Sequence, residues 1–305
     1  MAGVKHYQAV PFAGDKIGYG DGSALVEKTG PGDRYTLGEG PIMDWRTGIL
    51  SFVDITEGRF YRILPDGRKV CFEAGQPLGA AIPALKPGTY IFAATDGLYR
   101  FADESMTRIA DLRGYYNQWQ RSNDAKADPA GRLFFGAISN DKSYGNNGNL
   151  FCMDPAGGGI TVAQAETKIS NGMAWDSSRK KFFFSDSLEY AVFVYDYDVR
   201  TGQISNRKKL YDVEGGVPDG MCIDANDCLW VAVWGGKRIE QRDSVTGELL
   251  AVIDVPAEHV SSCCFMSDDT LFITSSAEGL QGQYDGCLFT CKIDAVKAGT
   301  DYCGF

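Results

Sequence analysis

The feature that most constrains the fold of this chain is a unit of two short strands that repeats from residue 41 onward. Each unit contains a turn, a strand rich in aromatic and β-branched residues, a polar stretch and a partner strand. The first strands of the units span residues 50–54, 90–94, 133–137, 182–186, 229–233 and 271–275. Their starts are separated by 40, 43, 49, 47 and 42 residues.

A period of about 40–50 residues that contains strands and no amphipathic helix is typical of a β-propeller. The copies predict an all-β, six-bladed propeller, with four-stranded antiparallel blades around a central channel, as a single domain over residues 35–305. A β-sandwich is the alternative, but it does not require a regular period. Residues 1–34 show no period and are expected to form a lid, an edge strand or a tail.

Charge and cysteine content limit the function classes. The net charge of −10 argues against nucleic acid or a membrane as partner, because both require basic patches. The sequence has no apolar run of the length of a membrane span and no signal-peptide core at its start. Nine cysteines fit neither a disulfide framework nor a CxxC metal site, so we expect reduced thiols and a cytoplasmic protein. The sequence does not indicate an oligomeric state.

Oxygen-bearing side chains recur at one phase of the repeat. The residues ten or eleven positions before each strand start are Glu39, Gly79 or Ala80, Asn123, Asn171, Asp219 and Ser261. Asn and Asp are common turn formers, and turn formation alone would explain each of them singly. Because the innermost strand of each propeller blade lines the channel, however, a shared phase predicts that these side chains converge on one point.

Two carboxylates at such a point would repel each other, and a bound cation would remove the repulsion. Neither histidine has this phase: His6 lies near the start of the chain, and His259 is expected in a partly exposed loop. An oxygen-only ligand set suits Ca²⁺, Mg²⁺ or Mn²⁺, with Zn²⁺ a less natural choice. The scarcity of histidine also argues against a Ser-His-Asp triad.

The motifs around these positions resemble one family in order and in combination. They include L-G-E-G-P at residues 37–41, R-S-N-D-A-K-A-D at 121–128, I-S-N-G-M-A-W at 169–175 and P-D-G-M-C-I-D at 218–224. They are similar to the motifs of senescence marker protein, gluconolactonase and the luciferin-regenerating enzyme. The resemblance covers about residues 35–295.

The resemblance implies a propeller that binds one divalent cation and hydrolyses a small-molecule sugar lactone. It implies that Glu39, Asn171 and Asp219 hold the metal, that Asn123 lies near metal and substrate, and that Arg121 contacts the sugar. Many relatives carry a glutamate that touches substrate where this chain has Asn140. We therefore assign Asn140 to substrate binding and expect it to change which sugar is recognised.

Asp219 is expected to act as metal ligand and general base together, because Glu39 is the only other base in the ring. Trp234 is expected to pack in the core. Two alternatives stay open at this point. One is a propeller that hydrolyses organophosphates, and the other is a non-catalytic scaffold that binds a cation or a protein.

Overall fold

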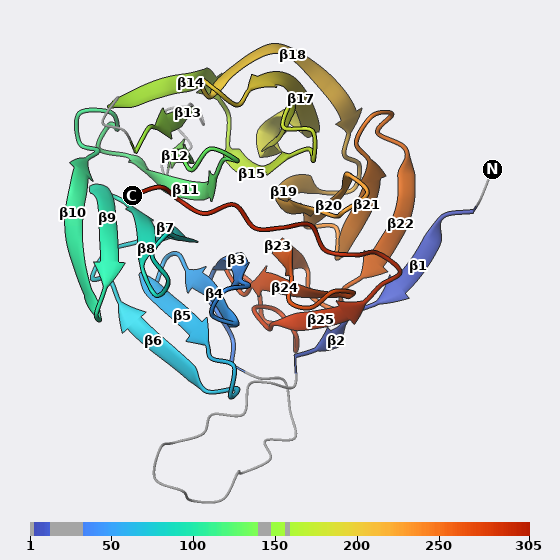
Figure 1. Ribbon diagram of the computed structural model, residues 1–305. Helices are drawn as coiled ribbons and strands as arrows, with labels where there is room; N and C mark the ends of the chain where they lie inside the picture. Colours follow the sequence, from blue (N-terminus) through green and yellow to red (C-terminus); the bar gives the residue numbers. More distant parts are fainter. Residues whose placement is uncertain (1–2, 13–32, 140–147, 156–158) are drawn as a thin grey trace, which may run out of the picture.

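In the computed structural model, the described residues are 3–12, 33–139, 148–155 and 159–305. Their sheets are arranged around a central axis (Figure 1). The strands are β1 (Lys5–Gln8), β2 (Val10–Pro11), β3 (Gly38–Asp44), β4 (Ile49–Asp54), β5 (Arg59–Ile63), β6 (Lys69–Glu73), β7 (Leu78–Pro83), β8 (Tyr90–Ala94), β9 (Gly97–Ala102), β10 (Ser105–Asp111), β11 (Gln120–Ala127), β12 (Leu133–Ser139), β13 (Gly148–Met153), β14 (Ile160–Thr167), β15 (Ser170–Trp175), β16 (Lys181–Asp186), β17 (Ala191–Asp198), β18 (Gln203–Asp212), β19 (Val217–Ile223), β20 (Cys228–Trp234), β21 (Arg238–Asp243), β22 (Leu249–Asp254), β23 (His259–Phe265), β24 (Thr270–Ser276) and β25 (Phe289–Lys292). One short 3-10 helix, η2 (Ser187–Glu189), follows β16.

Burial decreases from the inner strands to the outer strands, in line with the apolar sequences of the former and the polar sequences of the latter. The apolar run of β20, Leu229 to Val233, is at most 1% exposed because both faces of this strand are covered. Outer strands such as β18 are exposed or partly exposed along most of their length. The innermost strands β3, β7, β11, β15, β19 and β23 contact one another in a closed ring, in which β23 returns to β3 (Figure 1).

The all-β propeller is confirmed, but the prediction of six four-stranded blades is wrong. Within the described residues there are four sheets of four strands, namely β3–β6, β7–β10, β11–β14 and β15–β18. The fifth sheet has nine strands and contains the last two repeats of the sequence. It is continuous because Trp234 of β20 pairs with His259 of β23. In addition, β1 pairs in parallel with β22, and β2 pairs with β25. A sequence period gives the number of repeated strand units. It carries no information about backbone hydrogen bonds that join one unit to the next.

Aromatic side chains fill the space between neighbouring sheets. Phe60 of β5 packs edge-on against Phe92 of β8, with ring centroids 5.0 Å apart. Phe134 of β12 packs in the same way against Trp175 of β15, at 5.3 Å. Such pairs favour defined edge-to-face geometries. The sheets are therefore held at fixed angles, and the innermost strands, which carry the candidate site, are fixed with them.

The chain after β25 crosses one face of the propeller (Figure 1). The Lys297 amide donates to the Asp268 carbonyl at 3.0 Å, the Cys303 amide to the Pro83 carbonyl at 2.9 Å, and the Gly304 amide to the Gly131 carbonyl at 2.8 Å. These bonds tie three sheets together. All nine cysteines are free thiols, and six of them are buried. No helix in the described ranges is long and apolar enough to cross a membrane.

Candidate functional site

The ring positions identified in the sequence coincide with an irregularity in every innermost strand. Pairing with the second strand shifts between Glu39 and Ile42, Leu78 and Ala80, Ser122 and Ala125, Ser170 and Met173, Pro218 and Met221, and Val260 and Ser262. Such irregularities bend a strand and redirect its side chains. The polar residues of the ring therefore lie where the strands leave regular pairing.

Glu39, Asn171 and Asp219 come together from β3, β15 and β19. All three are buried, at 4–6% exposure. The Asp219 carboxyl group lies within interaction range of both the Glu39 carboxyl group and the Asn171 side chain. Ser187 of η2 supports them from behind, because its hydroxyl accepts from Asn171 Nδ2 at 3.1 Å and donates to the Pro218 carbonyl at 2.7 Å.

Arg121 and Asn123 form a second, adjoining unit on β11. Arg121 Nη1 donates to Asn123 Oδ1 and to the Ser122 carbonyl, both at 2.9 Å. Asn123 Nδ2 in turn donates to the Ser170 carbonyl at 3.0 Å, immediately before Asn171. Asn123 thus connects the guanidinium group of Arg121 to the strand that carries Asn171.

Glycines beside the ring residues allow the innermost strands to approach this closely. A Cβ atom on Gly172 would lie 2.5 Å from the Asp219 carbonyl oxygen. A Cβ atom on Gly220 would lie 2.1 Å from the Ser262 hydroxyl oxygen. The glycine after Asn171 and the glycine after Asp219 are therefore required by the packing of neighbouring strands.

Burial and like charge dominate the electrostatics of the site. Burial raises the pKa of Glu39 well above its usual range, and the nearby carboxylates of Asp219 and Asp124 raise it further. Burial, followed by Asp124, likewise raises the pKa of Asp219. Burial lowers the pKa of Arg121 to about 10, a value at which the guanidinium group is still charged at neutral pH. Without a cation, Glu39 and Asp219 cannot both be ionised easily.

The donor atoms suit a hard divalent cation. Asn171 Oδ1 and Asp219 Oδ1 are both buried, and within the described chain neither has a hydrogen-bond partner. Unpartnered buried oxygens are costly unless something binds them, and oxygen ligands are those that Ca²⁺ and Mg²⁺ prefer. The described residues contain no group of three or more His, Cys, Asp or Glu side chains placed to hold a metal. The unpartnered amide oxygen of Asn171 is thus a candidate third protein ligand beside the two carboxyl groups.

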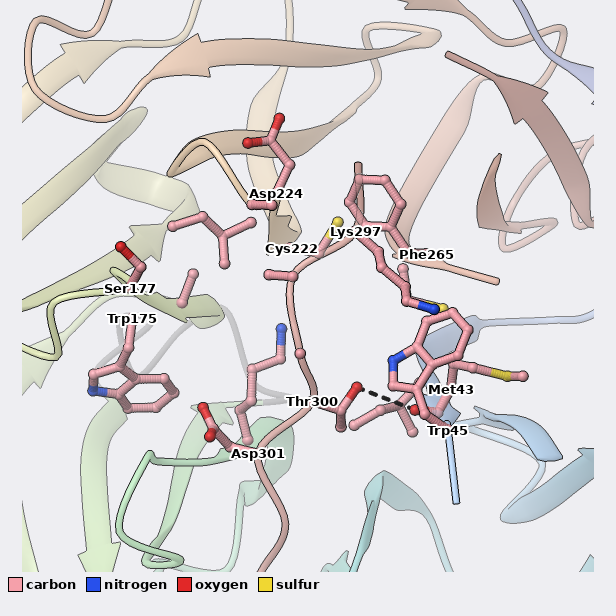
Figure 2. A pocket seen from close by; sticks show the side chains of 18 of the residues that line it. Met43, Trp45, Trp175, Ser177, Cys222, Asp224, Phe265, Lys297, Thr300 and Asp301 are labelled. Atoms are coloured by element: carbon pink, nitrogen blue, oxygen red, sulfur yellow. Dashed lines mark hydrogen bonds between the residues drawn. The ribbon is translucent and has the colours of Figure 1, made fainter. Parts of the chain in front are cut away.

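A cavity of about 570 Å³ lies at the other end of the same strands and includes none of the predicted site residues. It is lined by Met43, Trp175, Cys222 and Phe265, from later positions in the innermost strands, and by residues 297–301 of the C-terminal segment. Figure 2 shows these side chains, with Thr300 donating to the Met43 carbonyl at 3.1 Å. The cavity is therefore separate from the ring of Glu39, Asn171 and Asp219.

The outcome differs for three further residues: one prediction is untested, one is wrong, and one residue was not identified. Asn140 lies outside the described residues. His259 was expected in a loop, but it begins β23 and stacks on Trp234 with ring centroids 4.1 Å apart. Asp124, which acts on both site carboxylates, was not identified from the sequence. Its position directly after Asn123 in the R-S-N-D motif was the available signal.

Comparison with known proteins gives a consistent result. Residues 37–277 match the family described as SMP-30/Gluconolactonase/LRE-like region. Regucalcin of Gallus gallus is 34% identical over 283 residues, which cover 86% of this chain and 90% of that protein. YvrE of Bacillus subtilis (strain 168), named as a candidate sugar lactone lactonase, is 30% identical over 276 residues, covering 86% of this chain and 92% of that protein.

A solved structure shows the same similarity in three dimensions. The luciferin-regenerating enzyme superimposes with a TM-score of 0.82 and 27% sequence identity. The superposition covers 89% of this chain and 96% of that one. The family resemblance noted from the motifs is thus confirmed.

Proposed function

This chain belongs to the SMP-30/gluconolactonase/LRE-like family, and from that membership and the geometry of its site we propose that it opens the ring of a sugar-derived lactone with the help of one divalent cation. Within this proposal, Glu39, Asn171 and Asp219 hold the cation. Arg121 and Asn123 bind the substrate, and Asn140 contributes to the choice of sugar.

The observation that carries the proposal is the unpartnered Asp219 Oδ1, which is buried beside the Glu39 carboxyl group and the Asn171 amide. A buried carboxylate oxygen without a hydrogen bond is unfavourable in a purely structural role. In a hydrolase, the same atom is available for a cation or for the proton of a water molecule. Two raised carboxyl pKa values at one point are also typical of a functional site.

A bound divalent cation would supply the positive charge that keeps both carboxylates ionised and stabilises the oxyanion of a lactone carbonyl. Asp219 accepts a proton from water as the water oxygen bonds to the carbonyl carbon. The proton then passes to the ring oxygen as the carbon–oxygen bond breaks, which gives the open hydroxy acid. Arg121, held by Asn123, orients hydroxyl groups of the sugar through its forked donors.

A comparison of two substrates on one preparation tests the proposal. Hydrolysis of D-glucono-1,5-lactone and of a fluorophosphate is measured after chelation and after adding back Ca²⁺, Mg²⁺, Mn²⁺ or Zn²⁺. We expect lactone hydrolysis that disappears on chelation and returns with metal. Faster turnover of the fluorophosphate would favour a phosphoester hydrolase, and no turnover of either substrate would favour a scaffold.

A further inference from the structure

A row of paired residues crosses several strands next to the candidate site. Its members, in order, are Leu37, Ser276, His259, Trp234 and Val217, each paired with the next. Glu39 lies two residues after Leu37, and Asp219 lies two residues after Val217. A strand rises about 3.3 Å per residue, so the backbone positions of Glu39 and Asp219 lie roughly 7 Å along the chain from the row.

His259 and Trp234 occupy the middle of this row. Their rings stack with an interplanar angle of 15°, and both side chains are partly exposed. Trp234 also packs against the apolar cluster that contains Leu37. The pair thus forms a flat aromatic wall at the level just outside the Glu39–Asp219 pair. The apolar C–H face of a sugar-derived ring packs well on a wall of this kind.

The polar atoms of His259 are not used by the fold. Its Nδ1 is buried, and within the described ranges this atom has no hydrogen-bond partner. Burial lowers the pKa of His259, which favours the neutral ring, and a neutral imidazole offers one donor and one acceptor nitrogen. The hydroxyl group of a bound molecule can act as the partner of such a nitrogen.

Glu278 places a carboxylate at the same end of the molecule. It lies in the loop after β24, where its amide donates to the Ser276 hydroxyl at 3.0 Å, and its side chain is exposed. Its charge acts on both Arg121 and His259, because it raises the pKa of each against the effect of burial. Glu278 is thus within electrostatic range of Arg121, which is proposed above to bind substrate, and of His259 in the aromatic wall.

We propose that Trp234, His259 and Glu278 form a recognition surface that selects a polyhydroxylated lactone over a lactone without hydroxyl groups. The inference rests on the proposed function. The stacked rings cover the C–H face of the substrate, while His259 and Glu278 bind its hydroxyl groups. These are positioning residues, and they act on specificity without taking part in the proton transfer at Asp219.

The test compares D-glucono-1,5-lactone with δ-valerolactone, which has the same ring and no hydroxyl groups. The variants are His259→Gln, Glu278→Gln and Trp234→Ala, with Trp234→Phe to restore an aromatic ring. The matched controls are His6→Gln and Glu248→Gln, which alter exposed residues elsewhere. A thermal unfolding curve for each variant reports whether it is folded.

For His259→Gln and Glu278→Gln we expect KM for gluconolactone to rise about 10-fold with kcat within about 2-fold, because hydroxyl recognition is lost while the chemistry is retained. Their kcat/KM on δ-valerolactone should stay within about 2-fold of the unmodified protein. Trp234→Ala should raise KM for both lactones, because both present a C–H face to the stacked rings, and Trp234→Phe should recover most of the affinity. An equal loss on both lactones in His259→Gln and Glu278→Gln, or no change on gluconolactone in any of the three variants, overturns the recognition surface alone. If the unmodified protein opens neither lactone, the proposed function fails and this inference fails with it.

Discussion

The carboxyl groups of Glu39 and Asp219, from the first and fifth innermost strands in the chain, interact with each other in a buried ring at the propeller axis. Burial raises the pKa of both carboxyl groups, Asp124 raises each further, and the Asp219 carboxylate also raises the pKa of Glu39. The pair is therefore under electrostatic stress that either a proton or a cation relieves. The charge and the activity of the site therefore depend on whether a proton or a cation is bound there.

Replacing Asp219 with Asn should separate chemistry from binding. The amide retains an oxygen ligand and the shape of the side chain, but it cannot accept the proton of the attacking water. We expect kcat on the best lactone to fall by roughly 10²-fold or more, with weaker cation binding. Steady-state kinetics at saturating metal checks this. A near-normal kcat would assign the base to another residue.

Replacing Asn123 with Ala should act mainly on substrate affinity. The change removes the acceptor at 2.9 Å that holds Arg121 Nη1 and the donor to the Ser170 carbonyl. Because Arg121 would then be held only by its remaining bond to the Ser122 carbonyl, we expect KM to rise about 10-fold, with a smaller change in kcat. Steady-state kinetics gives the fold-change in KM and the fold-change in kcat, and the comparison of these two values is the test. A fall in kcat as large as that of Asp219→Asn would place Asn123 in the chemical step.

The stability of the metal-free protein should decrease as the pH rises. The folded state holds protons on Glu39 and Asp219 more tightly than the unfolded state does, since both pKa values are raised from the ordinary 4.5 and 3.8. Where the folded state binds more protons, the free energy of unfolding falls with increasing pH. The decline begins above the ordinary values and continues through the raised ones.

Thermal unfolding between pH 5 and pH 8 measures this decline. Glu39→Gln should reduce the slope of Tm against pH, because it removes one of the two carboxyl groups whose pKa is raised in the folded state. A saturating divalent cation should reduce the slope in the unmodified protein as well. Identical slopes for the unmodified protein and Glu39→Gln, both free of metal, would contradict the assignment of the raised pKa values.

Replacing Gly172 with Ala should distort the site through the backbone. The added Cβ atom would lie 2.5 Å from the Asp219 carbonyl oxygen, so β15 and β19 must separate. We expect a loss of about 1–3 kcal/mol in the free energy of unfolding, together with weaker cation binding. Gly114→Ala is the matched control, because nothing lies within 4 Å of its added atom. Equal denaturant midpoints for the two variants would show that the close approach is not needed.

The sequence predicted the propeller and the set of residues that meet at its axis, because both depend on local features. A strand with its preceding turn is a local unit, and a fixed step back from each strand reaches the irregularity where Glu39, Asn171 and Asp219 lie. Their roles as ligands stay a prediction. The number of sheets was wrong because the Trp234–His259 pair joins two repeats through backbone hydrogen bonds that no periodicity encodes.

The placement of His259 in a loop was wrong for a related reason. The residues after it, Val260, Ser261 and Ser262, are small and lack the aromatic pattern of the other strands, so the start of β23 resembled a loop. Its stacking on Trp234 depends on two strands that are distant in the sequence. Asp124 was overlooked because Asn123, its neighbour, has the shared phase.

The most direct test of the central claim is a titration of the metal-free protein with Mn²⁺ in which bound metal and lactone hydrolysis are measured on the same samples. The account predicts that activity is absent without metal, rises in proportion to bound Mn²⁺ and levels off at one equivalent, and that Glu39→Gln and Asp219→Asn shift the binding curve to higher concentration. Full activity at zero metal, or unchanged Mn²⁺ binding in both variants, would contradict it.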